Sequence, residues 1–419
     1  MSFPRYPEYK DSGVEWLGEI PAHWTVAPFK RLVEFQNGAD HKAVEVDEGY
    51  PVYGSGGVFA QASQYLYDGE SVLLGRKGTI DKPLHVTGRF WTVDTMYWTR
   101  IRREANGKFC YYVAASIPFA YYSTNTALPS MTQSALGAHA IAYPEKLEQT
   151  TIAAFLDHET AKIDALVAEQ EKLIALLKEK RQAVISHAVT KGINPDAPMK
   201  PSGIEWLGDV PAHWTMARLK NVSPFITVGI VVNPSDYVSE DGLPFIYGGD
   251  ISEGSIDADA ARRISPEHSE KNSKTRLETG DLLTVRVGAP GVTAVVGPDC
   301  EGGNCASVML IRRGAFDSRW LCFAMNSRMV RFQVEVVQYG AAQEQFNISH
   351  AINFWIAVPP RAEQAEIADG LTRETADIDS LISEAECAIN LLKERRSALI
   401  SAAVTGQIDV RGTVEAQAA

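Results

Sequence analysis

Two short loops in this chain combine basic side chains with glycine in a pattern suited to binding anions. Residues 76–78 read Arg-Lys-Gly and residues 286–288 read Arg-Val-Gly, and each triplet follows a short apolar run. A basic side chain on a rigid turn after a strand can reach a phosphate oxygen or the O6 and N7 acceptors of guanine. The same pattern is also typical of a surface arginine that only supports its own loop, so both interpretations stay open.

Polar side chains in other loops extend this candidate interface. Hydroxyl, amide and guanidinium groups are the ones that hydrogen-bond the edges of bases. The complete set of candidate DNA contacts is Arg76, Lys77, Thr79, Ser55, Thr124 and Asn125 in the first half of the chain and Arg286, Arg276, Gln338 and Gln343 in the second. Loops of this composition also occur in proteins that bind no nucleic acid, so the composition alone does not decide the function.

No catalytic motif accompanies these residues. The sequence lacks the Gly-x-x-x-x-Gly-Lys-Ser/Thr loop of P-loop ATPases. Residues 194–196 and 233–236 begin with Asn-Pro but lack the second proline and the aromatic residue that would stack on a flipped base in an amino-methyltransferase. Cys300 and Cys305 are close, but no second pair or nearby histidine completes a zinc site. The sequence therefore predicts a chain that has no catalytic residues and binds no metal or cofactor.

The charge balance argues against a protein that depends on its own basic surface to bind DNA. The 419 residues carry a formal net charge of −12, whereas proteins that bind mainly by neutralising phosphates are usually basic on at least one face. Base contacts, shape or basic partner subunits would then supply much of the affinity. The chain has no apolar run near the roughly 20 residues of a membrane span, no signal peptide and no disulfide framework. We therefore expect a cytoplasmic protein of two or three domains.

An internal repeat organises the chain around the two loops. Residues 12–24 (SGVEWLGEIPAHW) recur as residues 202–214 (SGIEWLGDVPAHW), and ten of the thirteen positions are identical. A second repeat begins with Glu-Gln at residues 148–149 and again at residues 363–364. The offset is 190 residues for the first repeat and 215 for the second, so the segment between them is longer in the second half. Two fixed frames around divergent middles favour a protein that changes its specificity while keeping its partners.

Each copy of the second repeat predicts a long helix with an apolar seam, because the apolar residues of the first are spaced 3, 7, 4 and 7. The predicted seam residues are Ile163, Leu166, Leu173, Leu177 and Val184 in the first helix and Ile378, Leu381, Ala388, Leu392 and Leu399 in the second. A helix with one narrow apolar stripe needs a partner, so we expect the two helices to pair antiparallel. The alternative is that each helix packs on its own domain. The basic segments 178–181 and 393–396 are attributed to helix-dipole complementarity and solvation, with DNA phosphates or partner subunits as the alternative.

The middle segments mix short apolar runs with Gly, Pro and Asn turns, which is typical of compact α+β domains. We predict two pseudo-symmetric globular domains joined by two long helices that form an antiparallel coiled coil. The predicted domains are residues 1–147 and 193–362, the helices are residues 148–192 and 363–410, and residues 411–419 are a disordered tail. The tryptophans that recur in the repeated segments are expected to pack this frame rather than stack on bases: Trp16, Trp24, Trp206 and Trp214.

The duplicated segment resembles the start of each half of the specificity subunits of Type I restriction–modification enzymes. The Pro-x-x-x-Glu-Gln helix starts at Pro144 and Pro359 and the Lys-Glu-Lys/Arg-Arg helix ends resemble that family too, so the resemblance covers essentially the whole chain. It implies two target-recognition domains that each read one half of a bipartite, asymmetric double-stranded DNA site. It also implies that the helix pair sets the unread gap.

The same resemblance implies partners for every chemical step. Two modification subunits would bind the helices and carry S-adenosylmethionine and adenine-N6 methylation, and two restriction subunits would add translocation and cleavage that need ATP and Mg. Three alternatives stay open. They are a stand-alone nuclease or single-chain restriction–methylation protein, a coiled-coil scaffold for protein ligands, and the specificity subunit of a methylation-only system.

Overall fold

The chain divides into two compact units, and each combines a globular domain with sections of both long helices. Unit 1 comprises residues 1–171 and 386–419, and unit 2 comprises residues 172–385. The structure is a computed structural model, and it describes residues 3–119, 130–339 and 344–412. The predicted contacts Thr124, Asn125 and Gln343 lie outside these residues, as does the predicted tail from residue 413 onward.

The domain of unit 1 is built on two sheets. One is antiparallel with strand order β10-β9-β12-β4, and the other has the order β5-β7-β6-β11-β8 with β6 and β11 parallel. The strands are β4 (Val33–Asn37), β5 (Glu45–Val46), β6 (Tyr50–Gly54), β7 (Gly57–Ala62), β8 (Tyr67–Asp68), β9 (Ser71–Gly75), β10 (Leu84–Val86), β11 (Arg89–Thr92) and β12 (Met96–Ile101). Helix α1 (Gly107–Ala115) packs on β9 and β10, and α3 (Gln133–Ala138) lies beside β4.

The domain of unit 2 repeats this design. Its antiparallel sheet has the order β17-β26-β23-β24, and its second sheet, β18-β22-β19-β25, again contains one parallel pair, β19 and β25. The strands are β17 (Ile226–Val228), β18 (Val238–Ser239), β19 (Leu243–Ile246), β20 (Ile251–Ser252), β21 (Ser255–Ile256), β22 (Arg262–Ile264), β23 (Leu282–Thr284), β24 (Thr293–Val295), β25 (Asn304–Cys305) and β26 (Met309–Ile311). The helices are α5 (Leu219–Val222), α6 (Pro266–Lys271), α7 (Ser318–Asn326), α8 (Arg328–Val337) and α9 (Ile348–Ala351).

The strands before the two basic loops are buried on both faces. In β9, Val72 and Leu74 join one core cluster, whereas Leu73 points into another. In β23, Leu282 and Leu283 divide in the same way. Successive side chains of a strand point to opposite faces, so a strand covered on both faces needs a continuous apolar run. This burial explains why an apolar run precedes each basic triplet, and it gives each loop a rigid base.

The repeated start segments contribute to two small two-stranded sheets in each domain, the first a hairpin and the second a pairing of two segments distant in the sequence. Unit 1 has β1 (Tyr9–Asp11) with β2 (Glu19–Pro21) and β3 (Thr25–Pro28) with β13 (Ala140–Tyr143). Unit 2 has β14 (Met199–Pro201) with β15 (Asp209–Pro211) and β16 (Thr215–Arg218) with β27 (Trp355–Val358). The recurrence of both pairs confirms two pseudo-symmetric α+β domains.

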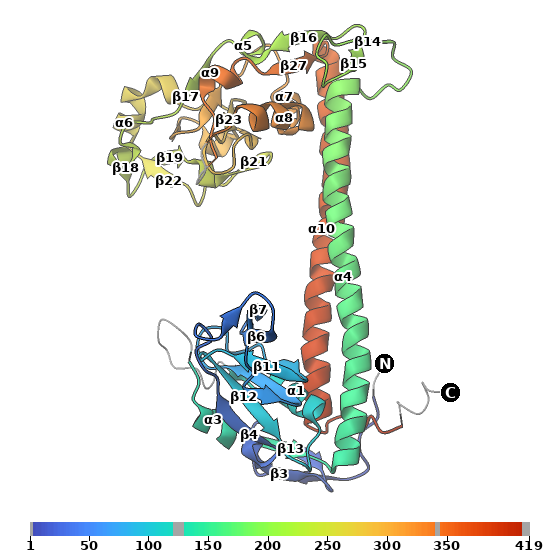
Figure 1. Cartoon of the computed structure of the whole chain (residues 1–419). Helices are drawn as coiled ribbons and strands as arrows, with labels where there is room; N and C mark the ends of the chain where they lie inside the picture. The colour runs from blue at the N-terminus through green and yellow to red at the C-terminus, as the bar shows by residue number, and fades with distance from the viewer. Residues whose placement is uncertain (1–2, 120–129, 340–343, 413–419) are drawn as a thin grey trace. The chain divides into compact units, whose positions relative to one another are not determined.

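The two long helices are α4 (Lys146–Lys191) and α10 (Arg361–Val404), which lie side by side in each unit (Figure 1). The second helix ends before residue 410, which was the expected limit. In unit 1, Asp164 of α4 pairs with Arg396 of α10, and in unit 2, Arg181 of α4 pairs with Asp379 of α10. Moving forward along α4 therefore means moving backward along α10, and the helices are antiparallel as predicted.

The seam between the helices differs in part from the predicted one. Leu166, Leu173 and Leu381 are 46%, 42% and 49% exposed and lie outside the seam. The buried and half-buried positions alternate at spacings of four and three, which is a regular heptad pattern. They are Leu156, Thr160, Ile163, Val167, Gln170, Ile174, Leu177, Arg181 and Val184 in α4 and Leu371, Thr375, Ile378, Ile382, Ala385, Ile389, Leu392, Arg396 and Leu399 in α10. At four places two apolar residues are adjacent, and the predicted spacing selected the one outside the seam: Leu166, Leu173, Leu381 and the half-buried Ala388.

Candidate nucleic-acid interface and the frame that positions it

At the start of each long helix, a glutamate carboxylate accepts hydrogen bonds from polar side chains of the repeated segment. In unit 1, the Glu148 carboxylate accepts hydrogen bonds from Trp24 Nε1 (3.0 Å) and the Tyr6 hydroxyl (2.9 Å), and His23 Nε2 lies 2.8 Å from its second oxygen. Burial and the neighbouring Glu148 carboxylate raise the pKa of the Tyr6 hydroxyl above its ordinary value. The repeated His-Trp and the repeated Glu therefore form one contact.

Unit 2 makes the same contact, because Trp214 Nε1 donates to Glu363 over 3.0 Å and His213 Nε2 lies 2.7 Å from that carboxylate. The neighbouring glutamines also have equal roles. Gln149 accepts the Asn106 amide and donates to a carbonyl at the helix start, and Gln364 accepts the Asp317 amide in the same way, each over 2.9 Å. A buried polar side chain that meets its partners fixes a geometry, so each domain is attached to its helix by the same joint.

The segment after the C-terminal end of each long helix packs against a repeated segment. Gly406, at φ +74°, follows α10 in unit 1, and a Cβ there would lie 2.3 Å from Pro21. The Tyr9 hydroxyl donates to the Gly406 carbonyl over 3.0 Å, and the Asp409 amide donates to the Pro4 carbonyl over 2.8 Å. The last described residues of the chain therefore complete the domain that its first residues begin.

The tryptophans of the repeated segments divide into two kinds. Trp24 and Trp214 are buried, as expected for frame residues, whereas Trp16 and Trp206 are 45% and 41% exposed. Trp16 stacks on His139 with ring centroids 4.6 Å apart, and this contact ties the repeated segment to the end of α3.

The contact between Trp16 and His139 is expected to depend on pH, because His139 can be protonated. Burial lowers its pKa from 6.5 to about 4, so the unfolded chain binds more protons than the folded one between these values. We expect the free energy of unfolding of unit 1 to decrease as the pH falls from about 6.5 to 4, by up to about 3 kcal/mol. Urea denaturation across this range in the wild type and in His139→Gln measures the contribution, because carboxylates titrate in both proteins. Parallel profiles would contradict it.

The first basic loop is held by backbone contacts on both sides. The Arg76 amide donates to the Thr95 carbonyl (2.8 Å), the Met131 amide donates to the Arg76 carbonyl (3.0 Å), and Arg76 Nη1 donates to the Asp94 carbonyl over 3.3 Å. Lys77 and Thr79 are exposed, and the backbone at Gly78 has a φ of +84°. The loop thus presents two exposed polar side chains and a partly exposed guanidinium on a fixed backbone.

The second basic loop has the equivalent position in unit 2. Its Arg286 exchanges hydrogen bonds with Phe346, because the Phe346 amide donates to the Arg286 carbonyl and Arg286 Nε donates to the Phe346 carbonyl, each over 3.2 Å. Arg286 follows β23 as Arg76 follows β9. The Nε of Arg286 is thus held by its own loop support, as in the second interpretation of this motif.

Of the other predicted contacts, Gln338 lies near the second loop, because it lines one pocket with Gly288, whereas Ser55 and Arg276 lie elsewhere. Ser55 lies in the two-residue turn between β6 and β7. Arg276 precedes β23, where it forms a backbone bridge with Asn304, whereas Arg286 follows that strand. The Gln338 amide ends α8 by donating to the Val334 carbonyl. The structure therefore supports two equivalent arginine loops and not one continuous set of contacts in each domain.

A groove of about 1090 Å³ beside β4 was not predicted from the sequence. Strand β4 is an edge strand, and the groove follows that edge. Its basic and amide side chains are Lys30, Arg31, Arg102, Gln36 and Gln133. Gln133 lies two residues after Met131, which bonds the Arg76 loop, so groove and loop are neighbours. The groove residues come from three distant segments, and no motif joins them.

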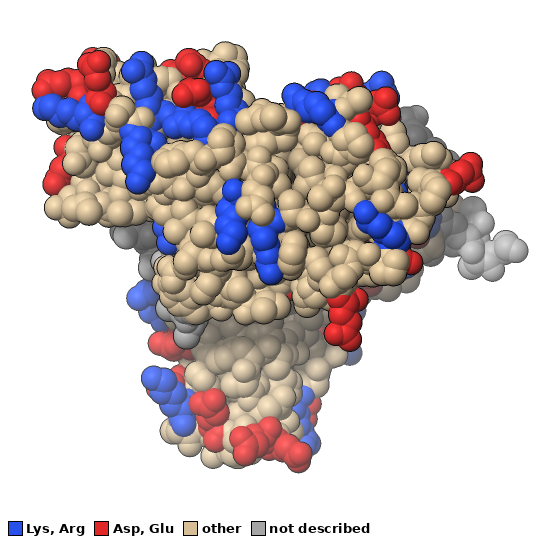
Figure 2. All heavy atoms as spheres, turned by 90° about the horizontal axis from the view of Figure 1, so that it is seen from above, with Lys and Arg blue, Asp and Glu red and all other residues tan. Residues whose placement is uncertain are grey.

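Charge on the surface is scattered. In the face drawn in Figure 2, Lys and Arg side chains are separated by uncharged and acidic surface, which is consistent with the net charge of −12. No helix among the described residues is long and apolar enough to cross a membrane.

Comparisons with known proteins agree with this organisation. Residues 21–175 match the family described as Type I restriction modification DNA specificity domain. The Type I restriction enzyme EcoBI specificity subunit of Escherichia coli is 26% identical over 286 residues, which is 65% of this chain and 59% of that protein. The EcoDI specificity subunit of Escherichia coli is 20% identical over 95% of this chain and 91% of that protein.

A solved structure described as the structural basis underlying complex assembly and conformational transition of the type I R-M system contains a chain with the same fold. It superposes with a TM-score of 0.69 at 16% identity and covers 92% of this chain and 98% of that one. The family match over residues 21–175, the two relatives and the duplicated frame together show that this chain is similar to the Type I restriction enzyme specificity subunits.

Proposed function

We propose that this chain is the DNA-recognition subunit of a Type I restriction–modification complex and that each domain reads one half of a bipartite, asymmetric site. The observation that carries this proposal is the duplication itself. Two domains of one topology, with divergent sequences, are attached by the same Glu–Trp joint to two antiparallel helices. Such a design holds two independent readers on one frame, whereas a nuclease or methyltransferase needs a catalytic centre.

Within the domain of unit 1, the Arg76 loop and the groove beside β4 divide the work of binding. We assign base or phosphate contact to Arg76 and Lys77, and contact with the sugar–phosphate backbone to Lys30, Arg31 and Arg102 of the groove. Phosphate contacts position a protein on the duplex, and base contacts specify the sequence. In this assignment an acidic protein binds DNA through a small number of basic side chains in the loop and the groove.

Replacing Arg76 with alanine is expected to relax recognition in one half-site only, by roughly tenfold to a hundredfold at the affected base pair. The reason is that each loop belongs to one domain. The measurement is binding or methylation, with the modification subunit present, on DNA libraries randomised in either half-site. Arg89→Ala, which removes an exposed charge paired with Asp68 in the second sheet of the same domain, is the matched control. Equal relaxation in both half-sites would contradict modular reading.

The helix pair is assigned two further roles, setting the gap and docking two modification subunits. Exposed leucines occupy equivalent positions of the repeat, Leu166 and Leu391 in unit 1 and Leu381 and Leu176 in unit 2. We assign partner docking to these leucines because their exposed positions recur in both halves of the chain. Two equal surfaces suit two copies of one partner better than a general scaffold.

We assign no catalytic step to this chain. Methylation with S-adenosylmethionine is assigned to the modification subunits, ATP- and Mg-dependent translocation and cleavage to restriction subunits, and the location to the cytoplasm. The decisive test is to map methylated adenines in a host genome with and without this chain. A bipartite methylated motif that depends on the chain supports the proposal, and its absence together with no DNA binding favours a scaffold. A methylation-only system is distinguished by the lack of cleavage of unmodified DNA.

A further inference from the structure

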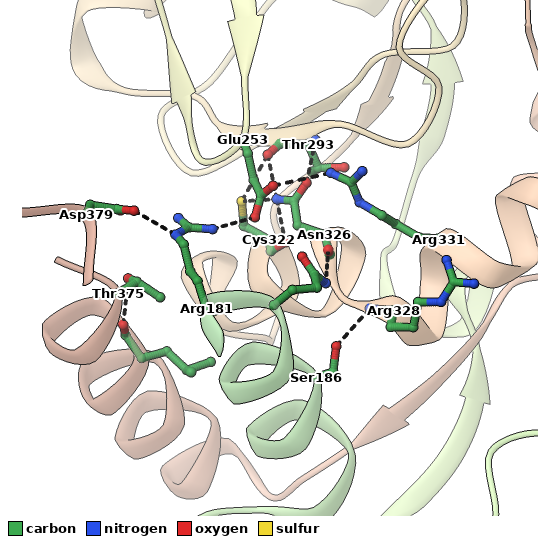
Figure 3. Close-up of polar contacts among 12 residues, drawn as sticks. Arg181, Ser186, Glu253, Thr293, Cys322, Asn326, Arg328, Arg331, Thr375 and Asp379 are labelled. Carbon is green, nitrogen blue, oxygen red and sulfur yellow. Dashed lines mark hydrogen bonds and ion pairs between the residues drawn. The ribbon is translucent and has the colours of Figure 1, made fainter. Parts of the chain in front are cut away.

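Arg181 stands where the helix pair meets the domain of unit 2 (Figure 3). Its Nη1 donates to Glu253 over 2.8 Å, and its Nε donates to Asp379 of α10 over 2.9 Å. Its side chain is only 20% exposed. Burial by itself lowers the pKa of this guanidinium, but the hydrogen bonds and the attraction of the two carboxylates outweigh burial and raise it. One arginine therefore links α4, α10 and the domain.

Glu253 is the residue of the domain that pairs with Arg181. It occupies the turn between β20 and β21, and its second oxygen accepts a hydrogen bond from Arg331 of α8 over 3.2 Å. Both carboxylate oxygens are thus used, one toward the helix pair and one toward the domain. Two further contacts of α4 lie nearby, from Gln182 to the Asn326 carbonyl and from the Arg328 amide to Ser186 (Figure 3).

The junction beside this link is not densely packed. A cavity of about 300 Å³ lies there, lined by residues of the domain and of both helices. Its lining includes Arg181, Glu253, Arg319, Cys322, Thr372 and Thr375. Beside this cavity the directional ion pairs restrain the domain, in addition to the apolar contacts that Ile185, Val189 and Leu371 of the two helices make with the domain core.

The first half of the chain contains the equivalent arginine with a different partner. Arg396 occupies the seam position of α10 that corresponds to Arg181, and it pairs with Asp164 of α4 through two contacts of 2.9 and 3.3 Å. Burial lowers the pKa of the Arg396 guanidinium, but on the domain side the Tyr111 side chain of α1 lies close enough to help raise it, although less than Asp164 does. The helix residue and its aspartate are repeated, whereas the domain residue differs.

This pattern revises the interpretation of the basic helix segments. The sequence alone favours helix-dipole complementarity and solvation for segments 178–181 and 393–396, but their last arginines are half-buried in the seam and ion-paired. Because a half-buried ion pair is weak evidence for a gain in stability, a role in geometry is the explanation that we pursue for these arginines.

We propose that Arg181 and Arg396 are positioning residues, each of which sets the orientation of its recognition domain on the helix pair and thereby the half-site that the domain reads. This proposal rests on the proposed function. The Arg–Asp pair between the helices is the same in both halves. The domain residue that lies beside the arginine differs, and it is Glu253 in unit 2 and Tyr111 in unit 1.

The first experiment measures orientation without DNA. Spin labels at Asp259→Cys in the domain and Ser383→Cys on α10, both exposed positions, report the distance between domain and helix in the complete chain by electron paramagnetic resonance. A Cys387→Ser background removes the exposed native thiol. Arg181→Met and Glu253→Gln are each expected to broaden or shift this distance distribution. Lys271→Met, which removes an exposed ion pair within α6, is expected to leave it unchanged.

The second experiment measures specificity. With the modification subunit present, Arg181→Met is expected to lower discrimination in the half-site of the second domain roughly tenfold and to leave the other half-site unchanged. Arg181→Met combined with Glu253→Gln is expected to equal the single substitution, because both remove one link. Arg181→Lys keeps the charge but loses the two-pronged geometry, so it is expected to recover only part of the discrimination.

The outcomes separate the two proposals. An unchanged distance distribution in Arg181→Met and Glu253→Gln, with both proteins folded, would overturn the positioning role whatever the DNA result. Additive losses in the double variant would overturn the shared link. If the wild type selects no DNA site, the proposed function fails, while the distance measurement still decides whether Arg181 holds the domain.

Discussion

Replacing Trp24 with alanine is expected to lower the free energy of unfolding of unit 1 by about 3–5 kcal/mol. The Trp24 side chain is fully buried, its Nε1 donates to Glu148, and the end of the chain at Gly406 packs against its ring. The substitution removes apolar contacts, leaves a cavity and deprives Glu148 of a donor. Urea denaturation measures the loss, and hydrogen exchange at the start of α4 assigns it to unit 1.

The matched control lies in the same repeated segment. Trp16 is 45% exposed and contacts His139 through one face, so Trp16→Ala is expected to cost about 1 kcal/mol or less. Trp214→Ala is expected to repeat the large effect in unit 2, because Trp214 has the same partner type in Glu363. Similar losses for Trp16 and Trp24 would show that the Glu–Trp joint does not hold the frame.

Inserting heptads into both helices is expected to change the gap in the recognised DNA site. The insertions are placed after Glu171 in α4 and after Ala385 in α10, at the boundary between the two units. One heptad adds about 10 Å with little rotation, which corresponds to about three base pairs. Three base pairs rotate B-DNA by roughly a third of a turn, so the second half-site would no longer face its domain. One heptad is therefore expected to abolish recognition or to weaken it strongly.

Three heptads in each helix are expected to restore recognition. They add about 32 Å, close to the roughly 34–36 Å of one DNA turn, so both half-sites face their domains again with a gap longer by about nine or ten base pairs. Selection from a library with variable gap length measures this directly. A four-residue insertion, which breaks the heptad pattern, is the control and is expected to yield no function. Recognition with the original gap after any heptad insertion would show that the length of the helices does not set the gap between the half-sites.

Much of the fold could be predicted because it is encoded in local patterns. The duplicated segment, the Glu-Gln helix starts and the heptad spacing led to two α+β domains and two antiparallel helices, which the structure confirms. The candidate site was less accessible. The two arginine loops were found because an apolar run, a basic residue and glycine are neighbours in the chain. The groove with Lys30, Arg31 and Arg102 was not found, because those residues are distant in the sequence.

The sequence by itself determined the duplicated frame and the presence of two long helices with an apolar seam, because repeats and heptads are properties of neighbouring residues. Only the tertiary structure decided between adjacent candidates such as Leu166 and Val167, since residues one apart differ by about 100° around a helix and the partner selects the buried one. It alone brought Arg181 to Glu253, 72 residues away in the chain. The arginine loops were visible in the sequence, but the contact that holds a whole domain in place depends on the packing of three elements.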